Sequence, residues 1–329
     1  MAFQTKIILI SLVFSFIVAL VIIPLLRKLK VGQIERRDGP QSHLKKQGTP
    51  TMGGIIMIIA LLIIGGFISY RYIASGNQEN LETGKRLIPL LMVTIGFGVI
   101  GLIDDLKKLI GKNTDGLKPA YKMLGLLVVA VSFVLFIVSC LNIGTDIQIP
   151  FLKTFINIPI WLYIPFSVFV LLGTTNAINL TDGIDGLSTS VTTVIVSCLT
   201  VIGVILNVKE IVVFGCILIG ACLAFLIFNL HPAKVFMGDT GSLLLGGAVA
   251  SMALYMRIPL LLIIIAFIPI IETVSVIIQV AYFKKTGERI FKMAPIHHHF
   301  ELSGWKENKI VSVFTVITLI CCIFGMFAI

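Results

Sequence analysis

Residues 176–187 read Asn-Ala-Ile-Asn-Leu-Thr-Asp-Gly-Ile-Asp-Gly-Leu, a polar stretch between two long apolar runs. Both runs are long enough to cross a bilayer, so the stretch is expected to be a short loop at a membrane face. Asp182 and Asp185 are three residues apart and each precedes a glycine. Capping of the following helix is one reading of these acids. Two Asp, two Asn and two Gly beside hydrocarbon favour a functional site instead, because charge there is costly.

Composition places the whole chain in a membrane. Of its 329 residues, 57% are hydrophobic and 13% are charged, against about 25% charged residues in soluble domains. The first apolar run, residues 7–26, can span by itself, and no small-residue cleavage site follows it, so no cleaved signal peptide is expected. The net charge of +10 is explained by basic cytoplasmic loops and does not require nucleic acid as a partner.

The predicted fold is an all-α polytopic membrane protein with about ten transmembrane helices. A bend is expected at Pro269, a solvated loop over residues 76–85, and a short outer β-hairpin over residues 141–158, where apolar and polar residues alternate. The ten spans are expected at about 5–26, 52–70, 87–103, 121–140, 159–178, 186–206, 210–229, 241–256, 258–282 and 309–328.

Charge patterning sets the expected orientation. The loops after odd-numbered spans hold 19 of the 26 Lys and Arg, so these loops should face the cytoplasm and both termini the outside. All five His and seven of the eight Asp also fall on the cytoplasmic side. These Asp are Asp38, Asp104, Asp105, Asp115, Asp182, Asp185 and Asp239. The six cysteines lie in or beside apolar runs and read as buried thiols, neither disulfides nor zinc ligands.

Two further acidic motifs border the membrane. Asp104 and Asp105 are adjacent where the third span ends, with Lys107 and Lys108 just beyond. Adjacent carboxylates bind a divalent cation or raise one another's pKa, although a charged helix end is the alternative. Asp239 lies between two glycines in Phe-Met-Gly-Asp-Thr-Gly-Ser, residues 236–242, which allows close backbone approach to a phosphate or metal.

The remaining motifs carry weaker signals. Phe236 could stack on a base or be an interfacial aromatic. Three consecutive histidines, residues 297–299, do not have zinc-helix spacing but could donate to phosphate oxygens. Glu272 and Gln279 are seven apart on one helix face, where helix–helix hydrogen bonding is the alternative to a site.

Together these residues are suited to Mg²⁺-assisted phosphoryl transfer at a membrane face. A transporter, the alternative class, would place charges at mid-membrane and show repeat symmetry. The sequence has its acids at one face instead, with only Glu272 clearly deeper.

The motifs resemble the polyprenyl-phosphate N-acetylhexosamine-1-phosphate transferase superfamily, and within it the branch that carries a triple histidine. The resemblance covers nearly the whole chain. It rests on Gly-Thr-Pro-Thr-Met-Gly-Gly (48–54), Asp-Asp-Leu-Lys-Lys (104–108), Asn-Leu-Thr-Asp-Gly-Ile-Asp-Gly-Leu (179–187), Phe-Met-Gly-Asp-Thr-Gly-Ser (236–242) and Pro-Ile-His-His-His-Phe-Glu-Leu (295–302).

The resemblance implies a ten-helix enzyme of the bacterial inner membrane whose active site faces the cytoplasm. It would transfer phospho-MurNAc-pentapeptide from UDP-MurNAc-pentapeptide to undecaprenyl phosphate, giving lipid I and UMP; a related transferase with another UDP-sugar is the alternative. The implied cofactor is Mg²⁺. The implied partners are the two substrates, membrane lipid and a second copy of the chain.

Site residues follow from the resemblance by position. Asp239 would bind the metal, and Asp104 or Asp105 would be the base, with Asp104 favoured. The implied catalytic residues are Asp104, Asp105, Lys122, Asp182, Asp239, His297 and His298. The implied substrate-binding residues are Lys46, Thr51, Lys108, Asn179, Asp182, Gly183, Asp185, Asn229, Phe236, Gln279 and His299. Residues 116–122 depart from the family pattern, so Lys118 and Lys122 remain alternatives.

Overall fold

The computed structural model describes residues 2–29, 46, 48–111 and 116–329. Several residues of the predicted cytoplasmic face lie outside these ranges, namely Arg36, Arg37, Asp38, His43, Lys45 and Asp115.

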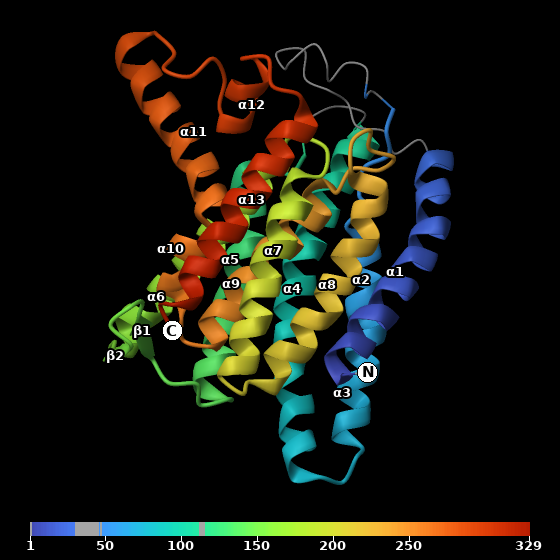
Figure 1. Ribbon diagram of the computed structural model, residues 1–329, viewed down its shortest axis with the longest axis vertical. Coiled ribbons are helices and arrows are strands. Elements are labelled where there is room, and N and C mark those ends of the chain that lie inside the picture. Colours follow the sequence, from blue (N-terminus) through green and yellow to red (C-terminus); the bar gives the residue numbers. More distant parts are fainter. Residues whose placement is uncertain (1, 30–45, 47, 112–115) are drawn as a thin grey trace.

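Long apolar helices make up most of the structure (Figure 1). Within the described residues, nine helices are long and apolar enough to cross a membrane. They are α1 (Phe3–Lys28), the continuous stretch Ile55–Ile73, α4 (Gln78–Gly111), α5 (Pro119–Ser139), α6 (Ile160–Thr181), α7 (Leu187–Ile205), α8 (Lys209–Asn229), α11 (Phe267–Thr286) and α13 (Glu307–Met326). The prediction of an all-α polytopic membrane protein is therefore confirmed.

The tenth expected span, at residues 241–256, is α9 (Gly238–Tyr255). It is helical but opens with the polar run Gly-Asp-Thr-Gly-Ser, and it is not among the nine apolar spans. Every residue from Thr240 to Tyr255 is buried, so α9 lies inside the bundle, packed against α4 and α6. A helix with no lipid-facing side can begin with a polar turn, and that turn is where the acidic site forms.

Two span boundaries differ from expectation. The loop expected over residues 76–85 is wrong, because α4 already begins at Gln78. The Asn77 side chain accepts the Glu79 backbone N–H at 2.9 Å, which caps the helix start. The span expected at 52–70 runs instead through α2 (Ile55–Ala60), the π-helical turn η2 (Leu61–Gly65) and α3 (Gly66–Ile73).

The bend expected at Pro269 lies a few residues earlier. The short helices η3 (Pro259–Leu261) and α10 (Leu262–Ile265) precede Ala266, whose backbone is not helical, and α11 starts at Phe267. Pro269 therefore occupies the first turn of α11, where its missing N–H is not needed. Beyond this turn α11 leans away from the other helices (Figure 1), and its buried residues are Ile268, Pro269, Glu272 and Ser275.

The predicted β-hairpin is present. Strands β1 (Asp146–Ile149) and β2 (Thr154–Asn157) pair antiparallel, with Asp146 opposite Asn157. Arg257 fixes the hairpin to the loop after α9 by donating to both carboxylate oxygens of Asp146, at 2.7 and 2.9 Å.

The bundle has two distinct ends. Both chain termini lie toward the end that carries the hairpin, and α12 (Ile296–Glu301) lies at the opposite end (Figure 1). All six cysteines are free thiols, as the sequence predicts. Cys198, Cys216, Cys222 and Cys322 are buried and Cys321 is half-buried, but the expected burial is wrong for Cys140, which is exposed at the end of α5.

Candidate active site

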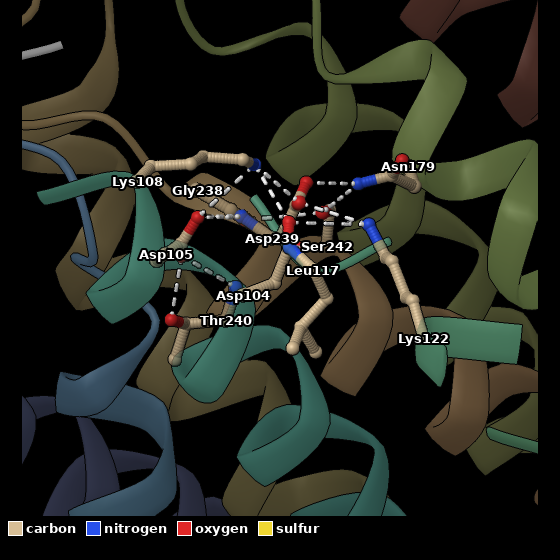
Figure 2. Close-up of polar contacts among 10 residues, drawn as sticks. All are labelled: Asp104, Asp105, Lys108, Leu117, Lys122, Asn179, Gly238, Asp239, Thr240 and Ser242. Atoms are coloured by element: carbon tan, nitrogen blue, oxygen red, sulfur yellow. Dashed lines mark hydrogen bonds and ion pairs between the residues drawn. The ribbon is translucent and has the colours of Figure 1, made fainter. Parts of the chain in front are cut away.

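Three carboxylates meet where α4 ends and α9 begins. Asp104 and Asp105 come from α4, and Asp239 comes from the first turn of α9 (Figure 2). One oxygen from each lies within 4.8 Å of the others. Gly101 permits this approach, because a Cβ there would overlap the backbone carbonyl of Asp239. The structure thus brings together three acids predicted from two separate motifs.

Two lysines converge on the same carboxylates (Figure 2). Lys108 Nζ lies 2.7 Å from Asp239 Oδ2 and 2.7 Å from Asp104 Oδ2. Lys122, from α5, places its Nζ 2.9 Å from Asp239 Oδ2. Lys108 and Lys122 approach Asp239 from different helices, so its Oδ2 atom contacts two ammonium groups.

Asp105 has a different environment from Asp104. Its carboxylate accepts the Thr240 backbone N–H at 2.9 Å, the Thr240 hydroxyl at 2.7 Å and the Asp239 N–H at 3.3 Å. It therefore satisfies backbone donors at the start of α9 and fixes the turn that carries Asp239. In this arrangement Asp105 positions Asp239 and has little accepting capacity left.

Two further groups orient the site. Asn179, near the end of α6, donates through Nδ2 to Asp239 Oδ1 at 2.7 Å and to Ser242 Oγ at 2.8 Å. The Leu117 backbone N–H donates to Asp104 Oδ1 at 2.6 Å. Asp239 is thus held on one oxygen by an amide and on the other by ammonium groups.

Asp182 follows the last residue of α6 and is partly buried. Burial and the nearby charges of Asp239, Asp105 and Asp185 raise the pKa of Asp182 to about 8. Loss of solvation and like charges both disfavour the ionised form, so Asp182 is mostly protonated at neutral pH.

A second polar cluster forms around Asp185. Lys46 Nζ lies 2.8 Å from Asp185 Oδ1 and 2.6 Å from Glu307 Oε2, and His231 Nδ1 lies 3.0 Å from Asp185 Oδ2. Burial acts to lower the pKa of Lys46, but the hydrogen bonds to Asp185 and Glu307 outweigh it and the pKa is raised. Four segments far apart in sequence are therefore joined here.

Sequence reasoning did not assign Glu307 or His231 to this cluster. Glu307 is an acid in the first turn of α13, a position where the helix dipole alone accounts for it. His231 was visible only as one of five histidines on the polar face. Oxygen and nitrogen atoms of Asp185, His231 and Glu307 also lie within 4.8 Å of one another, but the ammonium group of Lys46 already contacts both carboxylates.

Asn229, Phe236 and Thr51 lie around the strand-like contact between residues 50–53 and 235–236. The Phe236 N–H donates to Pro50 O at 2.8 Å, and Phe236 O accepts the Gly53 N–H at 2.9 Å. Asn229 is buried and donates to Val235 O at 3.0 Å, so its amide shapes this loop. The Thr51 hydroxyl and an Asp105 carboxylate oxygen both lie next to Gly238, so close that a Cβ at this glycine would overlap them. The Phe236 ring is partly exposed.

The remaining predicted residues lie on α11 and α12 and make local contacts. His298 Nδ1 lies 3.1 Å from Glu301 Oε2, and His299 Nδ1 accepts the Lys292 N–H at 3.2 Å. Gln279 bonds to both backbone groups of Phe291, at 2.9 and 3.1 Å, so its amide holds the loop after α11. His297 is fully buried beside Glu272.

The site gathers carboxylates, ammonium groups and the hydroxyls at the start of α9 at one end of a bundle of membrane-spanning helices. These features are typical of a membrane-embedded transferase that acts on phosphorylated substrates. Comparison with known proteins agrees. Residues 87–257 match the model for glycosyl transferase family 4, and residues 46–58 match signature 1 of phospho-N-acetylmuramoyl-pentapeptide-transferase.

Curated relatives narrow the class. The phospho-N-acetylmuramoyl-pentapeptide-transferase of Clostridium perfringens (strain 13 / Type A) is 52% identical over 95% of this chain and 95% of its own length. Those of Acetivibrio thermocellus and Clostridium novyi (strain NT) are 48% and 46% identical, each over 97% of this chain and 93% and 94% of their own lengths. The chain belongs to the phospho-N-acetylmuramoyl-pentapeptide-transferase family.

Proposed function

We propose that this chain transfers phospho-MurNAc-pentapeptide from UDP-MurNAc-pentapeptide to undecaprenyl phosphate, forming lipid I and UMP in peptidoglycan biosynthesis. Family membership over nearly the full length supports this reaction. The observation that carries it is the meeting of Asp104, Asp239 and two lysines. A reaction between a diphosphate and a phosphate needs charge neutralisation at one point, and this cluster supplies it.

The acidic site fits a divalent cation. Carboxylate oxygens are the ligands that Mg²⁺ prefers, and the three acids already lie within 4.8 Å of one another. Two ammonium groups at Asp239 Oδ2 show that this position attracts positive charge. We infer that Asp239 would hold Mg²⁺ with Asp104 beside it, while Asp105 keeps its bonds to the start of α9. When bound, Mg²⁺ would neutralise the diphosphate.

The chain's own residues have distinct proposed roles at the phosphates. Lys108 and Lys122 are long enough to leave Asp239 and bind phosphate oxygens when a substrate enters. Asp104 is the base toward the lipid phosphate, because Asp105 is committed to Thr240 and the Asp239 N–H. Asn179 keeps Asp239 oriented through its bond to Oδ1.

The Asp185 cluster is proposed to bind the nucleotide end of the substrate. Lys46 carries a positive charge that two carboxylates hold in place, and the partly exposed ring of Phe236 offers a flat surface for uracil. Thr51, Asn229 and Gly183 shape this region through their backbone and side-chain contacts.

The active site is proposed to face the cytoplasm, where UDP-sugars are available. The distribution of Lys and Arg along the sequence supports this orientation, and so does the position of both termini at the end opposite α12 (Figure 1). The membrane is then the bacterial inner membrane, and a second copy of the chain remains a proposed partner.

An assay of UMP release tests the proposed substrate. Purified protein should release UMP from UDP-MurNAc-pentapeptide only when a polyprenyl phosphate and Mg²⁺ are present. UDP-N-acetylglucosamine in place of the pentapeptide substrate should give at most background release. Equal turnover of both nucleotide sugars would instead favour a related transferase with another specificity.

A further inference from the structure

An apolar groove of about 670 Å³ lies between α3, α4 and α5, outside the acidic site. Its lining side chains are apolar apart from Ser69 and Tyr70. The Ser69 hydroxyl is turned into the contact between α3 and α4, where it donates to the Gly84 carbonyl at 2.7 Å. The groove is therefore suited to hydrocarbon, and the proposed transfer chemistry does not use it.

Glycines create this groove. At Gly65 the helix packs so close to α4 that a Cβ would overlap the Leu91 side chain. At Gly66, by contrast, a Cβ would meet no atom within 4 Å, so the missing side chain leaves open space. On the other wall, a Cβ at Gly96 would lie 3.0 Å from Val129 of α5. The walls are thus held in place by close packing, and an unfilled apolar space between them would lose dispersion contacts.

The length of the groove matches one leaflet of a bilayer. Its lining residues on α4 extend from Ile88 to Ile100, which corresponds to about 18 Å at a rise of about 1.5 Å per residue. One leaflet is half of a hydrocarbon core about 30 Å thick. A fatty-acyl chain in the groove would therefore run from the membrane surface toward the centre of the bilayer.

The mouth of the groove lies at the hairpin end of the bundle, where α8 begins. Arg86 Nη1 lies 3.7 Å from Oε1 of Glu210, which is in the first turn of α8. Lys85 precedes Arg86, and Ile88 lines the groove three residues later. Residues three apart share a helix face, and Lys85 and Ile88 are both exposed. Lys85 is therefore placed where a lipid headgroup would meet water.

Two polar side chains at this mouth are suited to the headgroup of a phospholipid. Tyr70 lines the groove and is 67% exposed, and tyrosine is enriched where hydrocarbon meets water. Within the described part of the chain no carboxylate pairs with Lys85, whereas Arg86 lies within 4 Å of Glu82 and Glu210. An unpaired lysine at the membrane surface attracts anionic lipid.

We propose that this groove binds one anionic phospholipid of the leaflet on the hairpin side, with an acyl chain between α3 and α4 and the phosphate at Lys85 and Tyr70. The tail of the polyprenyl substrate is the other candidate, because the groove ends one helical turn before Asp104. Two features favour the phospholipid. Gly125 of α5 packs directly onto Ile100 and closes that end, and the free basic residue lies at the opposite end. The inference does not depend on the proposed function.

Native mass spectrometry of delipidated protein, titrated with dioleoyl phosphatidylglycerol, tests the groove. Wild type should bind one molecule more tightly than any further ones, and more tightly than dioleoyl phosphatidylcholine. Gly66→Leu fills the groove without meeting protein atoms, so the tight binding should be lost. Gly173→Leu on α6 is the matched control, because a Cβ there also meets no atom within 4 Å, and it should bind as wild type does. Tight binding by Gly66→Leu at the wild-type level would overturn the proposal.

The headgroup contact is tested by a surface variant that does not alter the packing of the helices. Lys85→Gln should weaken phosphatidylglycerol binding about five-fold, the effect of one basic residue at a membrane surface, and should leave phosphatidylcholine binding unchanged. Lys153→Gln, in the hairpin at the same end, is the control and should bind both lipids as wild type does. Wild-type affinity of Lys85→Gln for phosphatidylglycerol would also overturn the proposal.

Kinetics distinguish the phospholipid from the polyprenyl tail. KM for the polyprenyl phosphate should be the same in wild type and Gly66→Leu. A raised KM together with unchanged phosphatidylglycerol binding would assign the groove to the substrate tail and overturn the proposal. Failure of wild type to turn over the UDP-sugar would refute the proposed function alone, because the lipid titrations need no substrate.

Discussion

At the scale of single residues, the four aspartates nearest the site have four different environments. Asp239 collects two ammonium groups, Asp105 caps α9, and Asp104 is shared between Lys108 and the Leu117 N–H. Burial and the nearby charges of Asp239, Asp105 and Asp185 raise the pKa of Asp182. Sequence alone predicted that these acids gather, but it could not separate their roles, because each role depends on neighbours from other helices.

Asp182 should make stability depend on pH. Its pKa of about 8 in the folded protein lies above the value of about 3.9 for an unfolded chain. The folded state therefore keeps a proton that unfolding releases, and stability is lost as pH rises from about 4 to about 8. Asp182→Asn mimics the protonated form, so it should melt a few degrees higher than wild type at pH 8 and similarly at pH 4–5.

Thermal unfolding in detergent with a chelator measures this difference, and thiol labelling of the buried cysteines reports unfolding. Parallel pH dependence of the two melting temperatures would show that Asp182 ionises normally.

Glu307 was found only in the structure, and its role can be measured. Glu307→Gln removes one of the two charges that hold Lys46. A hydrogen bond between charged groups contributes about 1.5–3 kcal/mol, so KM for the UDP-sugar should rise roughly ten-fold. KM for the lipid should stay constant. Glu79→Gln is the control, because Glu79 is an exposed partner of Lys209. Equal changes for both substrates would exclude Glu307 from the nucleotide region.

At the scale of helices and strands, apolar runs and alternation predicted most of the structure. The hairpin is confirmed, and so are nine helices of spanning length among the described residues. Burial of the cysteines is confirmed for four of the six, and Cys140 is exposed. The predicted boundaries of helices were wrong where a local contact, and not the composition of the segment, determines where a helix begins. The polar residues 78–85 are helical because Asn77 caps them, and the chain breaks at Ala266 before Pro269.

The contact between α4 and α9 is the element that assembles the acidic site. Gly101→Ala places a methyl group against the Asp239 carbonyl, and overpacking of this kind costs about 1–3 kcal/mol. We expect a lower melting temperature and a loss of turnover greater than the loss of stability, since Asp104 moves away from Asp239. Gly173→Ala, on α6, meets no atom within 4 Å, so it should leave turnover unchanged and should not lower the melting temperature. A Gly101→Ala protein with wild-type turnover would refute this role of the contact.

At the scale of the whole molecule, the two ends of the bundle differ in chemistry. The hairpin and both termini lie at one end (Figure 1), and the acids, lysines and histidines of the site lie at the other. Loop charges predicted this separation, although they could not predict which acids touch. The close approach of α9 to Gly101 of α4 and the contact between Glu272 and His297 depend on packing between distant segments, which sequence patterns do not encode.

The proposed orientation can be tested with membrane-impermeant thiol reagents. In a Cys140→Ser background, Leu152→Cys at the exposed hairpin tip should be labelled in intact spheroplasts. Lys285→Cys, at the exposed end of α11, should be labelled only after the membrane is opened. The reverse pattern would place the site outside the cell.

The central claim is that Asp239 and its acidic neighbours form a divalent cation site that supports phosphosugar transfer. Titration of Mg²⁺ against UMP release tests it most directly, in wild type, in Asp239→Asn and in Asp146→Asn, whose acid pairs with Arg257 in the hairpin. Wild type and Asp146→Asn should show the same saturable dependence on Mg²⁺, and folded Asp239→Asn should lose at least about 100-fold in turnover at any concentration. Mg²⁺-dependent turnover at the wild-type level in Asp239→Asn would contradict the account.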